Sequence, residues 1–412
     1  MTIYKIKDRS IYYYLKMFPC ALKLIFAEII AFLIAPFFRK EIWLFGEKKT
    51  EARDNGYHFY KYIKKKYPQI CSYYAISEGS SDYNKVAALG NVVRYDSFRH
   101  CILFFLAKYR LCSQIHGVRP FENFPGLPRL YFYKRKGQLQ INLKHGISKD
   151  FRPDSFDFRK VGFDLYVCGA KPEYEYIKKT FQYPDKNIVL SGFCRFDALH
   201  HLALPKKTIL IMPTFRSWLK PSDSSKDTAS IEEMEAFKKS NFFKSYLSLL
   251  SNPMIETIFS DYGYEIVFYL HYTFQPYRKA FEEQQRLLNN IIIAGRDDYD
   301  VQQLLIDSSI LITDYSSVFF DFAYMHRPLV YYQFDKREYR EKHYQEGYFT
   351  YERDGFGPVF KNPDEVLSYV LFLLRNDGNV ENEYMARISD FFIPYDDHNC
   401  DRVYDAIMRL DS

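Results

Sequence analysis

The segment Ile310–Tyr332 reads ILITDYSSVFFDFAYMHRPLVYY and carries the clearest structural pattern in the chain. It opens with apolar residues that predict a buried strand, Ile310–Thr313. A turn rich in hydroxyl groups follows, and the apolar residues after it predict a helix over 317–324. The next apolar run predicts a second strand, Leu329–Tyr332. A strand, a helix and a strand in this order are typical of a parallel sheet flanked by helices.

The same alternation of apolar runs and helical stretches extends over most of the chain. Before residue 204 we expect helices that include 57–67 and 98–109, and strands at Ile42–Phe45, Ser72–Ile76, Leu111–Ile115, Leu139–Leu143, Leu165–Cys168 and Ile188–Leu190. After residue 204 we expect helices that include 231–250 and 301–306, and further strands at Thr208–Met212, Glu265–Leu270 and Asn290–Ala294. The two series predict an α/β protein with two Rossmann-like domains facing a cleft, with ligands at the carboxyl ends of the strands.

Residues 24–38, LIFAEIIAFLIAPFF, form a strongly apolar segment near the N-terminus. The segment has 15 residues and is interrupted by Glu28 and Pro36, whereas a membrane-spanning helix needs about 20 apolar residues. Basic residues accompany it at Lys5, Lys7, Arg9, Lys16 and Lys23. We therefore expect a helix that lies on an anionic membrane surface. A helix packed against the protein's own core and a true membrane span are the alternatives.

The composition excludes several classes of protein. Of the 412 residues, 26% are charged and 47% are hydrophobic, which excludes a disordered or fibrous chain. The formal net charge of +6 permits an anionic membrane or a polyanionic substrate. No nucleic-acid-binding module is recognisable, so we expect no nucleic acid partner. The seven cysteines include no CxxC pair, and neither a GxGxxG nor a P-loop sequence occurs. We therefore expect no metal and no cofactor.

The turn at 314–317 is a candidate phosphate site. Ser316 and Ser317 precede the predicted helix, whose N-terminus presents unpaired N–H groups and the positive end of the helix dipole. Asp321 lies four residues after Ser317 and shares its helix face. Its carboxylate is suited to a ligand hydroxyl rather than to a phosphate. The alternative is that one of the two serines only caps the helix.

A histidine follows one of the strands expected before residue 204. His145 comes after the apolar run 139–143 and precedes Gly146, which leaves room for a substrate to approach. A histidine at a strand end is well placed to act as a general base. A purely structural histidine is the alternative.

Two strands expected after residue 204 also end in polar residues. His271 follows Leu270, and Pro213, Thr214 and Arg216 follow Thr208–Met212. Because the carboxyl ends of parallel strands lie at one edge of a sheet, we expect these residues to converge with the two serines.

At these positions the chain resembles the CDP-glycerol glycerophosphotransferase family of teichoic acid synthesis. The segment ITDYSSVFFDFA with the following RPLVYY resembles the donor-site segment of that family. KHG at 144–146 is similar to its Trp-His-Gly, GFCRFD at 192–197 to its Gly-Tyr-Pro-Arg-Asn-Asp, and MPTFR at 212–216 to its Ala-Pro-Thr-Trp-Arg. DNGYHFYKYIKKKYP at 54–68, GPVFKNPDEV at 357–366 and YDDHNCDRV at 395–403 are also similar, so the resemblance spans residues 41–410.

The resemblance implies a GT-B fold and the transfer of a polyol phosphate, most simply glycerol phosphate, from a CDP-activated donor to an acceptor hydroxyl, with release of CMP. Together with the membrane-associating helical segment expected at 1–40, it implies an acceptor domain at 41–204 and a CDP-polyol-binding domain at 205–412 with terminal helices. His145 matches the proposed catalytic histidine. The donor-binding positions of the family match Arg195, Pro213, Thr214, His271, Ser316, Ser317 and Asp321. We expect His271 to take part in catalysis, and Gly146, Arg216 and Leu270 to line the substrate site.

Some residues depart from the family pattern. Lys144 replaces the tryptophan before His145, Tyr272 replaces a proline after His271, and Phe196 replaces an asparagine. These departures leave the polyol open, with CDP-ribitol as another candidate, and leave open whether the product is wall teichoic acid or a capsular polymer. The expected partners are a CDP-polyol, a lipid-linked glycan or polyol-phosphate acceptor, and the cytoplasmic face of the membrane, bound peripherally. A glycosyltransferase that uses a nucleotide sugar and a non-catalytic polymer-binding subunit are the competing hypotheses.

Overall fold

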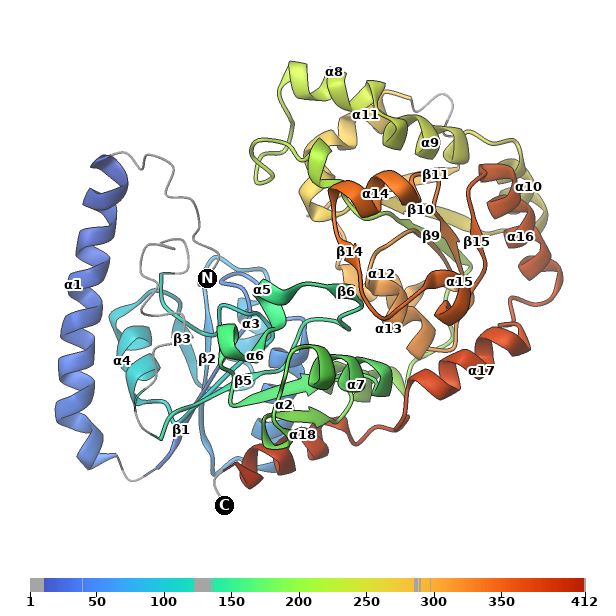
Figure 1. The fold of residues 1–412 in the computed structure, drawn as a ribbon. Helices are drawn as coiled ribbons and strands as arrows, with labels where there is room; N and C mark the ends of the chain where they lie inside the picture. The colour runs from blue at the N-terminus through green and yellow to red at the C-terminus, as the bar shows by residue number, and fades with distance from the viewer. Residues whose placement is uncertain are drawn as a thin grey trace. The chain divides into compact units, whose positions relative to one another are not determined.

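The computed structural model describes residues 11–38, 40–121, 135, 137–284, 288, 290–296 and 298–410. The chain forms two compact units: the first comprises residues 1–147, 152–198 and 393–412, and the second comprises residues 148–151 and 199–392. Each unit is built from helices around a parallel sheet (Figure 1). This arrangement confirms the predicted α/β class.

The first unit contains a seven-stranded sheet with the order β3-β2-β1-β4-β5-β7-β8. All of its strand pairs are parallel. The strands are β1 (Ile42–Gly46), β2 (Cys71–Ile76), β3 (Val92–Arg94), β4 (Tyr109–Cys112), β5 (Leu139–Asn142), β7 (Leu165–Cys168) and β8 (Ile188–Leu190). Central strands such as β1 are buried along their whole length, as expected for a parallel sheet covered on both faces.

The helices of the first unit come from the first half of the chain, with one added from the C-terminal end. They are α1 (Ile11–Ile34), α2 (Asn55–Lys66), α3 (Tyr83–Ala87), α4 (Phe98–Leu106), α5 (Pro153–Phe156), α6 (Phe158–Val161), α7 (Lys171–Thr180) and α18 (Asn399–Arg409). Short 3-10 turns add η1 (Ala35–Phe37), η3 (Asp185–Asn187) and η4 (Cys194–Leu199).

The second unit contains a six-stranded parallel sheet with the order β11-β10-β9-β12-β13-β15. Its strands are β9 (Thr208–Met212), β10 (Glu265–Tyr269), β11 (Ile291–Ala294), β12 (Ile310–Thr313), β13 (Leu329–Tyr332) and β15 (Val359–Phe360). A small antiparallel pair joins β6 (Asp150–Phe151) to β14 (Gln345–Glu346).

The second unit also contains most of the helices in the second half of the chain. They are α8 (Ile231–Lys239), α9 (Asn241–Leu250), α10 (Met254–Tyr262), α11 (Arg278–Glu282), α12 (Val301–Asp307), α13 (Val318–Tyr324), α14 (Lys336–Lys342), α15 (Tyr351–Asp354), α16 (Pro363–Arg375) and α17 (Asn382–Phe391), with 3-10 turns η5 (Ser217–Leu219) and η6 (Tyr272–Tyr277).

Most expected strands are present, with a few differences. The strand expected at 111–115 lies at 109–112, and β3 and β15 were not predicted. The helix expected over 231–250 is two helices, because Ser240 adopts an extended conformation between them and accepts a hydrogen bond from the N–H of Phe243 at 3.2 Å. A serine that caps a new helix ends the previous one.

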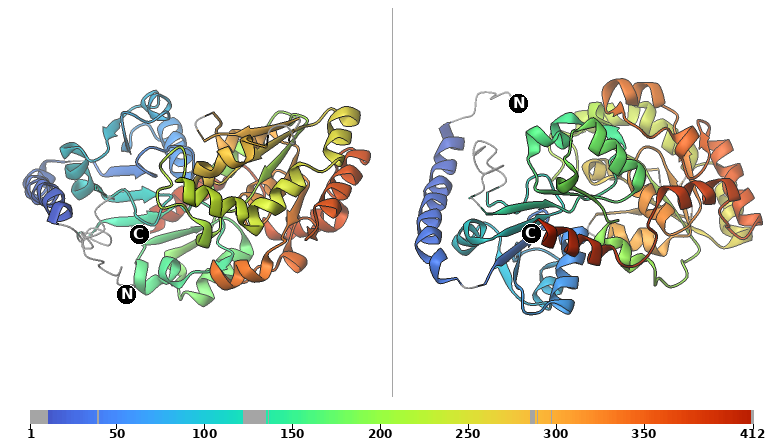
Figure 2. Two further views of the ribbon diagram at one scale, coloured as in Figure 1. Left: turned by 90° about the horizontal axis from the view of Figure 1, so that it is seen from above. Right: turned by 60° about the horizontal axis from the view of Figure 1, so that its bottom comes forward.

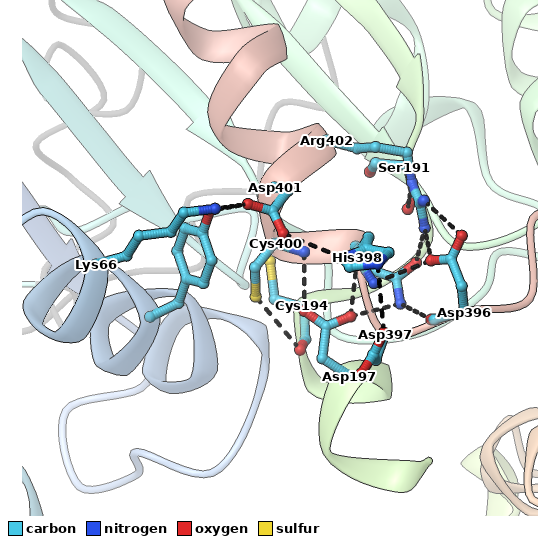
Figure 3. Close-up of polar contacts among 12 residues, drawn as sticks. Lys66, Ser191, Cys194, Asp197, Asp396, Asp397, His398, Cys400, Asp401 and Arg402 are labelled. Carbon is cyan, nitrogen blue, oxygen red and sulfur yellow. Dashed lines mark hydrogen bonds and ion pairs between the residues drawn. The ribbon is translucent and has the colours of Figure 1, made fainter.

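The C-terminal helix α18 belongs to the first unit, whereas residues 393–412 were expected in the second half. The Asp197 carboxylate accepts hydrogen bonds from the N–H groups of Asn399 at 2.8 Å and Cys400 at 2.9 Å, which are unpaired donors in the first turn of α18. Arg402 donates to Asp396 and to the Ser191 carbonyl at 2.8 Å (Figure 3). The matched segments GFCRFD and YDDHNCDRV therefore bind each other, so part of the family resemblance reflects the fold.

The N-terminal helix α1 also belongs to the first unit and is not a separate segment. Leu24, Ala27 and Ala31 are buried in a cluster with residues of α4, and Lys23 Nζ donates to the Asp96 carbonyl at 2.6 Å. Both views of Figure 2 show α1, in blue, at the edge of this unit. The remaining surface of α1 exposes large apolar side chains: Leu22, Ile25, Phe26, Ile29, Phe32 and Leu33.

The segment Met17–Phe37 is long and apolar enough to cross a membrane by length and composition alone. The expected basic residues Lys5, Lys7 and Arg9 lie outside the described residues, as does the side chain of Lys16. One face of α1 thus packs on the protein, as in the core-helix alternative, and the other face is exposed and apolar.

Candidate active site

In the first unit, the candidate residues lie in loops at the carboxyl ends of parallel strands. His145 and Gly146 follow β5, and Arg195 lies in η4 after β8. The loop before His145 turns sharply: Asn142 Oδ1 accepts from the Lys144 N–H at 3.0 Å, and Lys144 has a φ of +61°. A lysine in this left-handed region is strained, so the surrounding contacts must hold the turn.

His145 is exposed, but its pKa is lowered to about 3. The largest cause is desolvation by the protein around the ring, followed by the positive charges of Lys144 and Arg152, with a smaller effect of Arg195. A hydrogen bond with the Ser113 backbone raises the pKa in part. A ring N–H donated to that carbonyl leaves the second ring nitrogen with its lone pair, so the ring is neutral and able to accept a proton.

Arg195 is almost completely buried in the first unit, at 5% exposure. Its guanidinium donates to Asp54 Oδ1 at 2.8 Å and lies over the rings of Phe193 and Phe196, at 4.9 and 5.2 Å. Its charge still reaches His145, whose pKa it lowers. Both residues therefore lie at the carboxyl edge of the same sheet, with Arg195 near enough to lower the pKa of His145.

Lys144 occupies the position where the family has a tryptophan. Its ammonium lies over the rings of Phe156 at 4.4 Å and Tyr166 at 5.2 Å, and burial lowers its pKa to about 8. The side chain is thus accommodated in an aromatic pocket, where its charge is stabilised by the ring faces.

In the second unit, the three strands with candidate residues are neighbours. The order β10-β9-β12 brings together the residues that follow them. Thr214 and Arg216 follow β9, His271 follows β10, and the two serines follow β12. The predicted convergence of these strand ends is confirmed within this unit.

Arg216 lies at the centre of a buried ion network, with none of its side chain exposed. Its guanidinium is 2.9 Å from Asp314, binds Asp335 at 2.6 and 3.0 Å, and donates to the Thr214 carbonyl at 2.6 Å. Asp314 Oδ1 also accepts from the Thr214 N–H at 2.8 Å. This environment makes Arg216 a positioning residue for the loops after β9 and β12, not a group that contacts substrate.

His271 is half-buried and has a defined tautomer. Its Nδ1 accepts from the Thr273 N–H at 3.2 Å, so the neutral ring carries its hydrogen on Nε2. The ring lies 4.8 Å from the Phe215 ring and 4.7 Å from the Tyr272 ring. Leu270 contributes its side chain to the core, and its carbonyl accepts from the Gln275 amide at 2.7 Å.

A cavity of about 460 Å³ lies next to His271. Tyr272 lines this cavity, and its ring also contacts the His271 ring. Its other lining residues include Lys220, Ser224 and Arg296. Arg296 fixes the loop by donating to the carbonyls of Ser224 at 3.0 Å and Ser225 at 2.8 Å.

Ser317 stands at the N-cap of α13 but makes no side-chain capping bond, and it is exposed. The capping alternative is therefore wrong for Ser317. Asp321 is half-buried one turn further along this helix of seven residues. Thr214 Oγ1, in the neighbouring loop, is buried without a hydrogen-bond partner, as expected for a group that a ligand satisfies.

Several residues that hold these loops were not predicted from the sequence. Asp54 and Asn55 were quoted only as part of a matched segment, and Asp314 and Asp335 were not singled out. Asp314 directly follows β12 and Asp335 follows β13, so the strand-end criterion used for the other residues would have found both. Within the described residues, no cluster of three histidine, cysteine or acidic side chains is arranged to hold a metal.

A family model described as CDP-glycerol:poly(glycerophosphate) glycerophosphotransferase matches residues 28–409. The minor teichoic acid biosynthesis protein GgaB of Bacillus subtilis (strain 168) is 32% identical over 394 residues, which cover 95% of this chain and 42% of GgaB. The teichoic acid ribitol-phosphate primase of Bacillus spizizenii is 24% identical over 66% of this chain and 70% of the primase. The chain thus spans less than half the length of GgaB.

Solved structures share the fold. The wall teichoic acid polymerase TagF superposes with a TM-score of 0.65 at 17% identity, covering 98% of this chain and 99% of the other. A UDP-GlcNAc 2-epimerase from Neisseria meningitidis gives a TM-score of 0.53 at 12% identity, covering 90% of this chain and 100% of the other. At these identities the similarity concerns the fold alone.

Proposed function

Because the chain belongs to the CDP-glycerol:poly(glycerophosphate) glycerophosphotransferase family, we propose that it transfers a polyol phosphate from a CDP-activated donor to an acceptor hydroxyl in teichoic acid or capsular polymer synthesis. Glycerol phosphate is the first candidate for the transferred group. The family match over residues 28–409 carries this proposal. The converging strand ends of the second unit and the neutral His145 of the first unit support it.

The proposed step is a displacement at phosphorus. An acceptor oxygen forms a bond to the phosphorus next to the polyol, and the bond from that phosphorus to the bridging oxygen of CMP breaks. His145 takes the proton of the acceptor hydroxyl. His271 Nε2–H and the hydroxyls of Ser316 and Ser317 are the proposed donors to the phosphate oxygens, whose negative charge is spread in the transition state.

The low pKa of His145 fits this role when the donor's charge is considered. The cations of Lys144, Arg152 and Arg195 lower this pKa in the protein alone. A negatively charged CDP-polyol bound nearby offsets those charges and raises the pKa of His145 towards its usual range. The base therefore becomes stronger when the donor is bound.

The test is release of CMP from CDP-glycerol and from CDP-ribitol in the presence of a lipid-linked or polyol-phosphate acceptor. We expect release by the wild type and a fall of about 100-fold or more in His145→Ala, since a general base typically contributes 10²–10⁴-fold. His398→Ala, which removes an exposed histidine of the same unit, is the matched control and should keep wild-type turnover.

The other results separate the competing hypotheses. Release of UDP or GDP from a nucleotide sugar, with CDP-polyols inert, would support a glycosyltransferase. Binding of an anionic polymer that survives His145→Ala, without turnover of any donor, would support a non-catalytic subunit.

The proposal extends to the cytoplasmic face of the membrane, where α1 lies on the lipid surface. One face of α1 is packed on α4, and the other exposes Phe26, Ile29 and Phe32. Because one face of α1 is packed on the protein, this arrangement suits a helix in the membrane–water interface better than a helix that spans the bilayer. Flotation with anionic vesicles should be lost when Phe26 and Phe32 are both replaced by serine; unchanged flotation would reject α1 as the membrane contact.

A further inference from the structure

The N-terminal turn of α2 contacts three segments near His145, at Ser113, at Leu143–Lys144 and at Arg195. The segment Asp54–Gly56 was matched to the family by sequence without any assigned role. In the structure, Asp54 binds the Arg195 guanidinium at 2.8 Å, and the Gly56 N–H donates to Ser113 Oγ at 2.8 Å. Ser113 is the residue whose backbone bonds the His145 ring.

Asn55 lies at the centre of this turn and is completely buried. Its Nδ2 donates to the Leu143 carbonyl at 3.2 Å and to the Lys144 carbonyl at 2.8 Å. Its Oδ1 accepts from the Arg195 N–H at 3.0 Å. One amide therefore joins the loop after β5 to the turn after β8.

These contacts act on the backbone that carries the two candidate residues. The Lys144 carbonyl and the His145 N–H belong to one planar peptide unit, so a bond to the carbonyl fixes the plane from which His145 projects. The bond to the Arg195 N–H fixes the second peptide in the same way. The strained φ of +61° at Lys144 increases the need for such a bond.

The support of Asn55 is itself rigid. The Glu47 carboxylate, at the end of β1, accepts from the N–H groups of Arg53, Asp54 and Tyr57 at 2.8–3.1 Å. A Cβ on Gly56 would lie 3.0 Å from the Gly46 carbonyl oxygen, a tight contact that favours glycine at this position.

We propose that Asn55 is a positioning residue that holds His145 and Arg195 at a fixed separation for the transfer reaction. The effect of this role on the rate of transfer rests on the proposed function, whereas its effect on the geometry around His145 does not. Loss of the amide removes the bonds to the Lys144 carbonyl and the Arg195 N–H, so the His145 ring is less firmly held against the surrounding protein and against Arg195. Because desolvation by the surrounding protein and the charge of Arg195 both lower the pKa of His145, a looser site raises this pKa.

The test compares Asn55→Ala with Asn187→Ala. Asn187 is a matched control because it is a buried asparagine of the same unit whose Nδ2 donates to a backbone carbonyl, that of Asp164, at 2.8 Å. It lies at the amino end of β8, whereas Asn55 contacts loops at the carboxyl ends of the strands. We expect similar losses of thermal stability in the two variants.

Only Asn55→Ala should change the site. We expect kcat to fall about 10- to 100-fold, the cost of a small misplacement of reacting groups, with a change below about 3-fold in KM for the CDP-polyol. The pKa of His145, measured by NMR titration with His145→Gln to assign the resonance, should rise from about 3 towards the usual value of histidine.

Equal kcat and equal His145 titration in Asn55→Ala and Asn187→Ala would overturn the proposal. If Asn55→Ala does not fold, Asn55→Asp replaces it, since aspartate keeps the shape and the acceptor but turns an oxygen towards two carbonyls; an unchanged kcat in that variant would also overturn it. If the wild type releases no CMP, the proposed function fails, and the NMR titration still decides whether Asn55 positions His145.

Discussion

The two units hold their strand-end loops with side chains of different charge. In the first unit, the neutral amide of Asn55 bridges the loop before His145 and the turn at Arg195. In the second unit, the Arg216 guanidinium lies between Asp314 and Asp335, at 2.9 and 2.6 Å. Both bridging side chains are completely buried. Losing the amide leaves neutral groups unpaired, whereas losing the guanidinium leaves buried charges unpaired.

The charge of each network also indicates whether it can bind an anion or only holds its loops. Arg216 with its two carboxylates carries one net negative charge, so this network is unsuited to attract phosphate. In the first unit, Lys144, Arg152 and Arg195 all lower the pKa of His145, which indicates a positive potential at that ring. An arginine near a phosphate-binding loop is therefore not evidence of phosphate contact until its own partners are known.

Arg216→Met should produce the largest loss of stability. The variant leaves Asp314 and Asp335 buried without their cation, and breaking a buried ion pair costs about 3–5 kcal/mol. Urea denaturation followed by a probe in the second unit measures the loss. Arg337→Met is the control, because Arg337 pairs with Glu341 on an exposed face and is 93% exposed. A loss of unfolding free energy in Arg216→Met as small as that in Arg337→Met would show that the network does not hold the loops.

Acid should weaken the first unit through a neutral histidine. His100 is completely buried, its Nδ1 accepts from the Asp96 N–H at 3.1 Å, and burial lowers its pKa to about 4. In the unfolded chain the His100 ring binds a proton near pH 6.5, whereas in the folded protein it stays neutral down to about pH 4. Protonation therefore favours the unfolded chain, so the stability that the protein has above pH 6.5 is lost progressively as the pH falls towards 4.

The loss over that window amounts to about 3 kcal/mol at most. Urea denaturation at pH 7 and at pH 4.5 measures it, and the comparison with His100→Gln removes the contribution of other titrating groups. Equal losses in the wild type and His100→Gln would mean that His100 binds its proton as readily in the folded protein as in the unfolded chain.

The sequence predicted the strands and the strand-end residues well because both depend on local patterns. Apolar runs such as Ile310–Thr313 and Thr208–Met212 match β12 and β9 to the residue. Parallel pairing then brings their ends together, so Thr214, His271 and Ser317 could be grouped without a structure.

Contacts between segments distant in the sequence could not be predicted in this way. Asn55 binds the Arg195 backbone 140 positions later, and Asp197 binds the first turn of α18 more than 200 positions later. Nothing in the local sequence distinguishes Arg216, which is enclosed by Asp314 and Asp335, from an arginine that binds a ligand. Only the tertiary arrangement reveals which partner a buried charge has already found.

The smallest effect on stability separates Ser97 and Ser317, one N-cap serine from each unit. In the first unit, Ser97 Oγ accepts from the His100 N–H at 3.0 Å, so Ser97→Ala should cost about 1 kcal/mol. In the second unit, Ser317 makes no side-chain cap bond, so Ser317→Ala should cost less than about 0.5 kcal/mol. Because we propose that the Ser317 hydroxyl binds donor phosphate, KM for the CDP-polyol should rise in Ser317→Ala and stay unchanged in Ser97→Ala. Urea denaturation and initial-rate kinetics on both variants decide the matter. A stability loss in Ser317→Ala that equals that of Ser97→Ala, with unchanged KM, would return Ser317 to the role of a helix cap.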